Sequence, residues 1–381
     1  MKKVIEFIPL LANGGAETMM KDYCLGFDRE KVDVTVLVMG ERMKSANEEV
    51  LESFGQKIIY LGEQFYGTRV NLNPFQKLVR FVSRYFEFRK VIMEIRPDVI
   101  HSHLHVGLFF RFIPKQILKE TKLVYTVHNV FERYFSKSIK NIFKFIEYKE
   151  VKRLVHKYSM KLVTLHDDMN KDMREQFATD DVVTIENGIE LERFSFSEQG
   201  RKRIRQELKI PETAYVIGNV GRFHEQKNHE LIVDIFENVS NLREDAYLLL
   251  VGKGENTRQA TIDKLKSKGL LERTIIIQDR KDIPDIMSAM DVFLFPSRWE
   301  GFGNVLIEAQ SVGLHCVISD KVPRGTIVSD KVSVVGLNDS VKNWVDALNQ
   351  NTVMEEPVGD ISKYEIANSI LRLQDIYTDI A

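Results

Sequence analysis

Strand-like runs and helix-like stretches alternate along the first half of the chain. The runs are short and rich in β-branched residues: VIEF, VDVTVLVM, KIIYL, DVIHSH, KLVYTVHN, KLVTL and VVTIEN. Between them, apolar residues recur at helical spacing over 15–27, 47–55, 74–96, 105–119, 139–160 and 167–178. This alternation is typical of a parallel sheet with helices on both faces. It predicts a doubly wound α/β domain in the N-terminal half.

The same alternation restarts after a polar, charged stretch that follows Asn187 and Gly188. The run AYVIGNVGR opens it, and further strand-like runs cover 246–251, 274–278, 291–295 and 314–318. A last stretch, 361–380, is long enough to form a helix by itself. We expect an N-terminal domain at 1–190, a C-terminal domain at 195–355 and a helical segment at 356–381. Open α/β sheets bind ligands outside the carboxyl ends of their strands, so functional residues should directly follow strands.

Length and composition agree with two globular domains. At 381 residues the chain exceeds what one hydrophobic core usually organises, and 44% hydrophobic with 29% charged residues is ordinary for such proteins. Cys24 and Cys316 lie far apart, which argues against a disulfide framework or a cysteine zinc site. No apolar stretch approaches the roughly 20 residues that span a bilayer, and no signal-peptide cleavage site follows the N-terminus. We expect a cytoplasmic protein and leave attachment to the inner face of the plasma membrane open.

Positive charge is concentrated in the N-terminal half. The net charge is -1, but residues 69–161 hold 20 Lys and Arg against 7 Asp and Glu, which predicts an anionic partner. Within this stretch, residues 133–161 hold nine basic and two acidic residues, interspersed with Phe135, Ile139, Ile142, Phe143, Phe145 and Ile146. Such a basic amphipathic segment is typical of contact with anionic membrane, but it equally fits a structural helix with solvated lysines. Both interpretations stay open, and we expect no nucleic-acid partner.

The first candidate binding element is Gly221-Arg222-Phe223-His224-Glu225-Gln226-Lys227-Asn228, which lies between a strand-like run and a helical stretch. Two fixed cations at such a junction, close to a helix N-terminus, suit a diphosphate. The alternative is that Arg222 and Lys227 are merely solvated loop charges. Because the two occur together, after a strand and a glycine, we favour a phosphate site.

The second candidate element is the run FPSRWEGFGNVLIEA, residues 295–309. Gly301 and Gly303 allow the backbone to approach a ligand closely, and the residues from Asn304 onward have helical spacing. A helix that begins here places Glu308 between one and two turns inside it, near enough to face the same cleft as Glu300. The alternative is that Glu308 is an ordinary exposed helix residue and that the two glycines form only a turn.

Histidines occupy two of the N-terminal strand-like runs. His128 ends the run TVHN, and although a lone histidine is usually structural, a strand-end position favours function. His101, His103 and His105 alternate along DVIHSHLH and suggest a metal site. We expect none, because we identify no carboxylate or cysteine that completes the ligands. We also expect strand alternation to divide these side chains between the two faces.

Four motifs occur in an order and spacing that resemble one enzyme family. They are GRFHEQKN, the Glu300-to-Glu308 spacing within FPSRWEGFGNVLIEAQSVG, the early loop Gly14-Gly15-Ala16-Glu17, and the linker ENGIE. Together they resemble the retaining glycosyltransferases of family four, and the resemblance covers essentially the whole chain. It implies the GT-B fold, in which two Rossmann-like domains face a central cleft and the C-terminal helix returns to the N-terminal domain.

The resemblance implies a role for each motif residue. Arg222 and Lys227 would hold the donor diphosphate, Glu308 the ribose, and Glu300 with the backbone of Gly301, Phe302, Gly303 and Asn304 the donor sugar. From the N-terminal domain, Gly14 and Gly15 would form a flexible loop near the phosphates, and His128 would reach the donor sugar. Arg222, Lys227, Glu300 and His128 are therefore the expected catalytic residues.

The resemblance also implies a reaction. We expect transfer of a sugar, with retention, from a nucleotide-sugar donor, a uridine diphosphate sugar, to a hydroxyl of a lipid-linked glycan in polysaccharide biosynthesis. The chain has no Asp-x-Asp pair, which metal-dependent glycosyltransferases of the other major fold place on the diphosphate, so we expect no metal and no cofactor. Two alternatives remain: a sugar-nucleotide 2-epimerase of similar architecture, and a non-enzymatic two-domain binding protein. The glutamate spacing argues against the first, and the Arg222 and Lys227 pair argues against the second.

Overall fold

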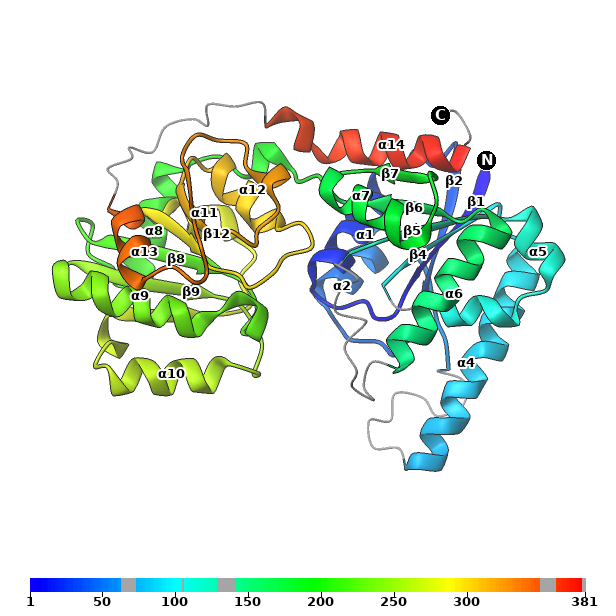
Figure 1. The fold of residues 1–381 in the computed structure, drawn as a ribbon, viewed down its shortest axis with the longest axis horizontal. Coiled ribbons are helices and arrows are strands. Elements are labelled where there is room, and N and C mark those ends of the chain that lie inside the picture. Colours follow the sequence, from blue (N-terminus) through cyan, green and yellow to red (C-terminus); the bar gives the residue numbers. More distant parts are fainter. Residues whose placement is uncertain (63–72, 105, 129–141, 350–360, 379–381) are drawn as a thin grey trace. The chain divides into compact units, whose positions relative to one another are not determined.

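Two compact α/β units make up the computed structural model (Figure 1). The first unit comprises residues 1–188 and 366–381, and the second comprises residues 189–365. The structure describes residues 1–62, 73–104, 106–128, 142–349 and 361–378. Each unit is considered by itself below.

In its described part, the first unit has a seven-stranded parallel sheet with the order β3-β2-β1-β4-β5-β6-β7. Its strands are β1 (Lys2–Ile8), β2 (Val32–Val38), β3 (Lys57–Tyr60), β4 (Val99–His103), β5 (Lys122–Thr126), β6 (Lys161–Thr164) and β7 (Val182–Thr184). Buried β-branched and aromatic side chains fill both faces of the central strands, as expected where helices cover both faces. The strand order reverses between β1 and β4, and such a reversal point is where open α/β sheets bind ligands.

Helices cover both faces of this sheet (Figure 1). One face packs against α4 (Pro74–Ile95), the 3₁₀ helix η1 (Gly107–Phe112), α5 (Lys115–Glu120), α6 (Ile142–Tyr158) and α7 (Asp167–Phe177). The other face packs against α1 (Gly15–Gly26), α2 (Ala46–Ser53) and α14 (Ile366–Thr378). The single helix expected over 105–119 is instead two short helices. Pro114 separates them, because a proline forces the residue before it, Ile113, into an extended conformation.

The C-terminal helix α14 belongs to the first unit, as the resemblance implied. Ile370, Leu373 and Tyr377 are buried in the same core cluster as residues of β1, β2 and α1. Polar contacts fix its register as well, because the Asp28 amide donates to Gln374 at 2.8 Å. The last helix of the chain is therefore part of the N-terminal core.

The second unit repeats the arrangement with a six-stranded parallel sheet in its described part, in the order β10-β9-β8-β11-β12-β13. Its strands are β8 (Tyr215–Val220), β9 (Ala246–Val251), β10 (Thr274–Ile277), β11 (Val292–Phe295), β12 (His315–Ser319) and β13 (Val332–Val335). Strand β13 was not predicted, because it is a short edge strand with three half-buried residues and gives only a weak pattern. Here the order reverses between β8 and β11.

Two groups of helices enclose the second sheet (Figure 1). One face packs against α9 (His229–Leu242), α10 (Arg258–Ser267) and α13 (Val341–Leu348) around Phe236 and Trp344. The others are α8 (Glu198–Glu207), α11 (Ile283–Ser288) and α12 (Asn304–Ser311). No helix in the described residues is both long enough and apolar enough to cross a membrane.

Candidate functional site

The two sequence elements predicted to bind the donor leave adjacent strands of the second sheet. Residues 221–228 follow β8, and residues 296–303 follow β11. These are the two strands between which the strand order reverses. Both loops therefore emerge at the carboxyl edge of the sheet, where this architecture binds ligands.

The two cations in the loop after β8 differ in exposure and in hydrogen-bond partners. The side chain of Arg222 is exposed, and it forms no hydrogen bond or ion pair with any residue that the structure describes. Lys227 ends a single 3₁₀ turn, Glu225–Lys227, and is half-buried. Asn228 then adopts a left-handed conformation with φ 56°, and α9 begins at the next residue. The loop thus places both cations just before a helix N-terminus, which attracts anions.

Lys227 forms an ion pair with Glu300 across the two loops. Its Nζ atom lies 2.7 Å from Oε1 of Glu300, and the two side chains are only 14% and 7% exposed. Gln226 donates to the other carboxylate oxygen at 3.1 Å, and the Lys227 ammonium lies 4.6 Å from the centre of the Phe295 ring. Because both charges are largely desolvated, their mutual orientation is well defined.

Further hydrogen bonds join the two loops. The Arg298 amide donates to the Gln226 carbonyl at 2.8 Å, and the Asn228 side chain donates to the Pro296 carbonyl at 3.2 Å. The two segments were predicted separately from the sequence, and the structure joins them into one polar surface. Lys227 and Glu300, which form the ion pair between them, are 73 residues apart in the chain.

The glycine-rich turn and helix α12 follow as predicted. Gly303 caps α12 with φ 93°, a left-handed conformation that residues with a Cβ rarely adopt. The helix begins at Asn304, so half-buried Glu308 lies just over one turn inside it. Gly301 and Phe302 are buried, and the Phe302 ring contacts Tyr364 with centroids 5.9 Å apart.

A third loop, Gly252-Lys253-Gly254 after β9, was missed by the sequence analysis. A Cβ at Gly252 would collide with the Gly221 carbonyl, and the Phe223 amide donates to the Lys253 carbonyl at 2.8 Å. Lys253 itself is paired with Asp279. Two glycines directly after the buried strand AYLLLV were the available signal, because glycines there mark a close backbone approach.

In the first unit, the predicted glycine loop follows β1 at the carboxyl edge of the sheet. Gly14 precedes α1, and a Cβ on it would collide with the Glu17 carboxylate, whereas a Cβ on Gly15 would meet nothing within 4 Å. The start of α2 supports this loop. Asn47 donates to the Ala12 carbonyl at 2.8 Å, and Ser45 donates to the Leu11 carbonyl at 2.6 Å.

The expected arrangement of the β4 histidines was wrong. His101 and His103 share one face of the strand, because residues two apart in a strand point the same way. A carboxylate does join them: Glu6 of the neighbouring strand β1 lies 2.7 Å from Nε2 of His103 and 3.3 Å from Nδ1 of His101. His105 lies outside the described residues.

These groups form a hydrogen-bond network. Nε2 of His101 contacts the Thr126 hydroxyl at 2.7 Å, and its Nδ1 contacts the hydroxyl of Tyr377, which also donates to Glu6. Nδ1 of His103 lies 3.0 Å from Nε2 of His128, the predicted catalytic histidine. Each ring nitrogen of His101 and His103 thus has a hydrogen-bond partner within the described residues.

Burial controls the protonation of this network. Burial alone would raise the pKa of Glu6, but the charges and hydrogen bonds of His101 and His103 outweigh it and hold that pKa well below its usual range. Burial, and then the charge of His101, lower the pKa of His103 to about 4, although Glu6 raises it. Burial, followed by the charges of His103 and His101, also lowers the pKa of His128. At neutral pH, Glu6 is therefore ionised while His103 and His128 are neutral.

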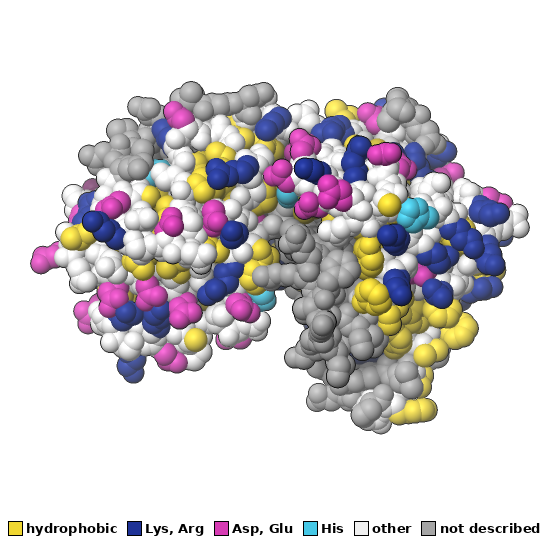
Figure 2. Space-filling view, viewed as in Figure 1, with side chains coloured by type: hydrophobic (Ala, Val, Ile, Leu, Met, Phe, Trp, Pro, Cys, Tyr) yellow, Lys and Arg dark blue, Asp and Glu magenta, His cyan; other side chains and the backbone are white. Residues whose placement is uncertain are grey.

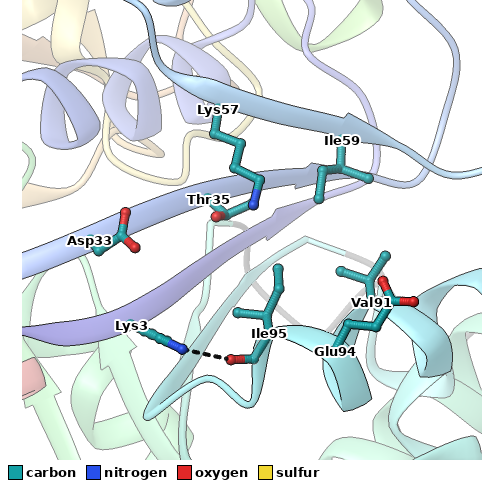
Figure 3. A pocket seen from close by; sticks show the side chains of 8 residues that line it. All are labelled: Lys3, Asp33, Thr35, Lys57, Ile59, Val91, Glu94 and Ile95. Carbon is teal, nitrogen blue, oxygen red and sulfur yellow. Dashed lines mark hydrogen bonds between the residues drawn. The ribbon is translucent and has the colours of Figure 1, made fainter.

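A separate cavity lies at the opposite edge of the first sheet. Its lining includes Lys3, Asp33 and Lys57, which lie at the amino ends of β1, β2 and β3 (Figure 3). Ligands of parallel α/β sheets bind at the carboxyl ends, so we do not assign the donor to this cavity.

The described part of the segment predicted to contact membrane is mainly structural. Residues 133–141, which include Phe135, Lys137, Ile139 and Lys140, lie outside the described residues, and so do the side chains of Ile142, Phe143 and Lys144. The rest of α6 buries Val151, Leu154 and Val155 in the core, while Phe145 and Ile146 are about two-fifths exposed. Larger exposed apolar groups occur on α4, where Phe75 and Phe86 are 70% and 68% exposed.

Comparison with known families divides the chain as the structure does. Residues 13–193 match the family described as Glycosyltransferase Family 4. Residues 200–365 match the family described as Glycosyl transferases group 1. The first range lies almost wholly in the first unit, and the second lies within the second unit.

Individual relatives and a solved structure show the same likeness. The chain is 26% identical over 320 residues to the UDP-Gal:alpha-D-GlcNAc-diphosphoundecaprenol alpha-1,3-galactosyltransferase of Escherichia coli, covering 80% of this chain and 81% of that protein. It is 24% identical to the putative glycosyltransferase EpsF of Bacillus subtilis strain 168, over 96% and 92% of the two chains. HepE of Anabaena, solved with UDP and glucose, superposes with a TM-score of 0.71 at 17% identity over 100% of this chain and 96% of HepE. At that identity the likeness concerns the fold, which is the GT-B fold expected from the sequence.

Proposed function

Because the chain belongs to the glycosyltransferases of family 4, we propose that it transfers a sugar, with retention of anomeric configuration, from a uridine diphosphate sugar to a lipid-linked acceptor hydroxyl. The observation that carries the proposal is the junction of the two predicted donor loops. The Lys227–Glu300 ion pair joins them at the reversal point of the second sheet. Cations and carboxylates at that edge match a diphosphate and vicinal sugar hydroxyls.

The two cations are proposed to hold the donor diphosphate. Lys227 is fixed by Glu300, and the exposed Arg222 carries a charge with no partner in the described structure. Both precede the N-terminus of α9, whose backbone dipole favours an anion. As the diphosphate leaves the sugar it gains negative charge, which preorganised cations stabilise.

The remaining polar groups are proposed to orient the donor. Glu308, just over one turn inside α12, is proposed to accept hydrogen bonds from the ribose, and Glu300 with the backbone of residues 301–304 to contact the sugar. In the first unit, His128 is proposed to contact the donor sugar, and Gly14 and Gly15 to adjust to the phosphates. We name no catalytic nucleophile, because retention in this family is attributed to attack on the same face as the departing phosphate.

The names of relatives support the proposed donor and acceptor. The name of the Escherichia coli relative gives a UDP-Gal donor and an alpha-D-GlcNAc-diphosphoundecaprenol acceptor, and HepE was solved with UDP and glucose. The absence of an Asp-x-Asp pair from the sequence supports diphosphate binding by protein cations instead of a divalent metal. We therefore propose that the reaction needs no metal.

We propose that a lipid-linked acceptor is reached through peripheral contact of α4 with anionic membrane. Phe75, Val82 and Phe86 lie on one exposed stripe of this helix, spaced seven and four residues apart. The cations Arg89 and Lys90 flank the stripe, and apolar side chains gather beside basic ones on this part of the surface (Figure 2). Exposed aromatic groups next to basic residues are typical of helices that lie in a membrane interface.

Acceptor-dependent release of the nucleoside diphosphate tests the proposed function. The purified protein is incubated with UDP-glucose, UDP-galactose, UDP-N-acetylglucosamine or GDP-mannose, with and without a short polyprenyl diphosphate-linked N-acetylglucosamine. We expect UDP release from one UDP-sugar only when the acceptor is present. Conversion of a nucleotide sugar without acceptor would instead indicate an epimerase. Binding without any turnover would indicate a binding protein.

A further inference from the structure

A chain of hydrogen bonds connects the middle of the first sheet with its ligand-binding edge. It begins at Glu6 in β1, passes through His103 at the end of β4, and ends at His128, two residues after β5. The two links measure 2.7 Å, from Glu6 Oε2 to His103 Nε2, and 3.0 Å, from His103 Nδ1 to His128 Nε2. Glu6 and His103 are completely buried, and His128 is 9% exposed.

The protonation states of Glu6, His103 and His128 determine which group donates in each of these hydrogen bonds. An ionised Glu6 can only accept, so His103 donates from Nε2 and, being neutral, has a bare Nδ1. That bare nitrogen must accept from His128, which therefore carries its proton on Nε2 and has a bare Nδ1. The neutral state of both histidines agrees with the lowering of their pKa by burial.

Burying the Glu6 carboxylate costs more free energy than a purely structural role would justify. Taking a carboxylate out of water costs several kcal/mol. Within the described structure, Glu6 pairs with no lysine or arginine, only with His101, His103 and the Tyr377 hydroxyl. An apolar residue would fill this strand position in the core of the sheet more favourably, so the ionised group points to a function. Two routes lead from Glu6 toward the carboxyl edge, through His101 to Thr126 and through His103 to His128. The second ends at the residue assigned to the donor.

We propose that Glu6 and His103 are positioning residues that hold His128 in the Nε2–H tautomer, so that its Nδ1 accepts a hydrogen bond from a hydroxyl of the donor sugar. The proposal rests on the proposed function, which assigns His128 to that sugar. In the described part of the chain, Nδ1 of His128 has no hydrogen-bond partner, so its lone pair is available. A sugar hydroxyl is the matching donor.

Nitrogen NMR of the full-length, ¹⁵N-histidine-labelled protein tests the tautomer directly. The His128 signals are identified by their loss in His128→Gln, and the two ring nitrogens of a neutral histidine have distinct shifts. We expect the Nε2–H form in the wild type and its loss or mixing in His103→Leu and Glu6→Gln. An Nδ1–H form in the wild type, or an unchanged His128 in folded His103→Leu, would overturn the proposal. This readout needs no activity, so it fails independently of the proposed function.

Kinetics distinguish positioning from a merely structural role. His103→Leu should lower kcat for sugar transfer by about two- to tenfold, because His128 loses the hydrogen bond that fixes its tautomer, while UDP affinity stays within about twofold. His103→Gln should recover most of the loss, because an amide can both donate to Glu6 and accept from His128. Equal kcat in the two variants at equal thermal stability, or a defect confined to UDP affinity, would contradict the proposal.

Discussion

Lys227 and Arg222 belong to one predicted phosphate site but lie in different environments. The ammonium of Lys227 is held by Glu300, which is nearly buried, whereas Arg222 is exposed and has no partner among the described residues. Removing one member of a buried pair leaves the other charge unpaired, which costs more than losing the pair itself. The two substitutions should therefore have the same effect on catalysis but different effects on stability.

We expect Arg222→Ala and Lys227→Ala each to reduce donor turnover by about ten- to a hundredfold. A charged hydrogen bond contributes about 1.5–3 kcal/mol, and each 1.4 kcal/mol is about tenfold in rate. Arg222→Ala should leave the melting temperature unchanged, while Lys227→Ala should lower it because Glu300 loses its partner. Steady-state kinetics and thermal unfolding measure both effects, with Lys202→Ala, an exposed site on α8, as control. Changes of less than a few-fold in both variants would refute the phosphate assignment.

Residue chemistry in the first unit was harder to predict than in the second. The motifs around Arg222, Lys227 and Glu300 are local in sequence, so their spacing could be read directly. Glu6 and His103 lie 97 residues apart and meet only because β1 pairs with β4. A charged residue within the buried strand KKVIEFI was the available signal, since an ionised group in such a strand requires partners.

At the scale of elements, the left-handed Gly303 sets where α12 begins. We expect Gly303→Ala to cost about 1–2 kcal/mol of stability, because φ of 93° is unfavourable for a residue with a Cβ. Space is not the obstacle, since the added Cβ would meet its first neighbour at 3.6 Å. Relief of this strain should move the start of α12, and with it Glu308, so UDP affinity should fall. Isothermal titration calorimetry measures that affinity.

Gly269→Ala is the matched control for this change. Gly269 also has positive φ, 68°, and a Cβ there would meet nothing within 4 Å, but it lies in the turn after α10. Its substitution should cost similar stability and leave UDP affinity unchanged. Equal loss of UDP affinity in both variants would show that α12 has no specific role.

Helix α4 gives the second element-scale prediction. We expect the double change Phe75→Ser and Phe86→Ser to reduce sedimentation with phosphatidylglycerol-containing vesicles several-fold, because these rings supply the exposed apolar stripe. The wild type should bind less as salt rises and should not bind pure phosphatidylcholine. Leu242→Ser on α9 is the control, since Leu242 is as exposed as Phe86, at 68%. Unchanged binding of the double variant would assign any membrane contact to another surface.

Elements with strong periodicity could be predicted from the sequence, and weak ones could not. The central strands are continuous buried β-branched runs between clear helical stretches, so their type and their order along the chain could be predicted. The edge strand β13 has only four residues, three of them half-buried, and gives no such pattern. The contact of α14 with the N-terminal core depends on Tyr377 and Ile370 meeting residues more than 300 positions away, which only the family resemblance implied.

At the scale of the whole molecule, buried neutral histidines should make stability depend on pH. Burial, and then the charge of Lys227, lower the pKa of His229 to about 4, and its ring stacks on Phe223. Between pH 6.5 and 4 the unfolded chain binds more protons than the folded one at this site, so stability falls as the pH falls. One pKa unit is about 1.4 kcal/mol, so His229 accounts for up to about 3 kcal/mol of this loss.

Replacing His229 should reduce the loss of unfolding free energy at acid pH. We expect His229→Gln to lose less unfolding free energy than the wild type between pH 7 and pH 4, as measured by urea unfolding at each pH. His156→Gln, at an exposed position of α6, is the control and should follow the wild type. A wild-type slope in His229→Gln would show that His229 is not neutral when buried.

For the whole chain, the proposed activity is sugar transfer with retention and without a metal. The most direct measurement is a ¹H NMR time course with an α-configured UDP-sugar, a polyprenyl diphosphate-linked acceptor and excess EDTA. We expect one new α-glycoside for each UDP released, from the first time point, at the same rate as without EDTA. A β-glycoside, an epimerised nucleotide sugar, or activity restored only by added magnesium or manganese would contradict it.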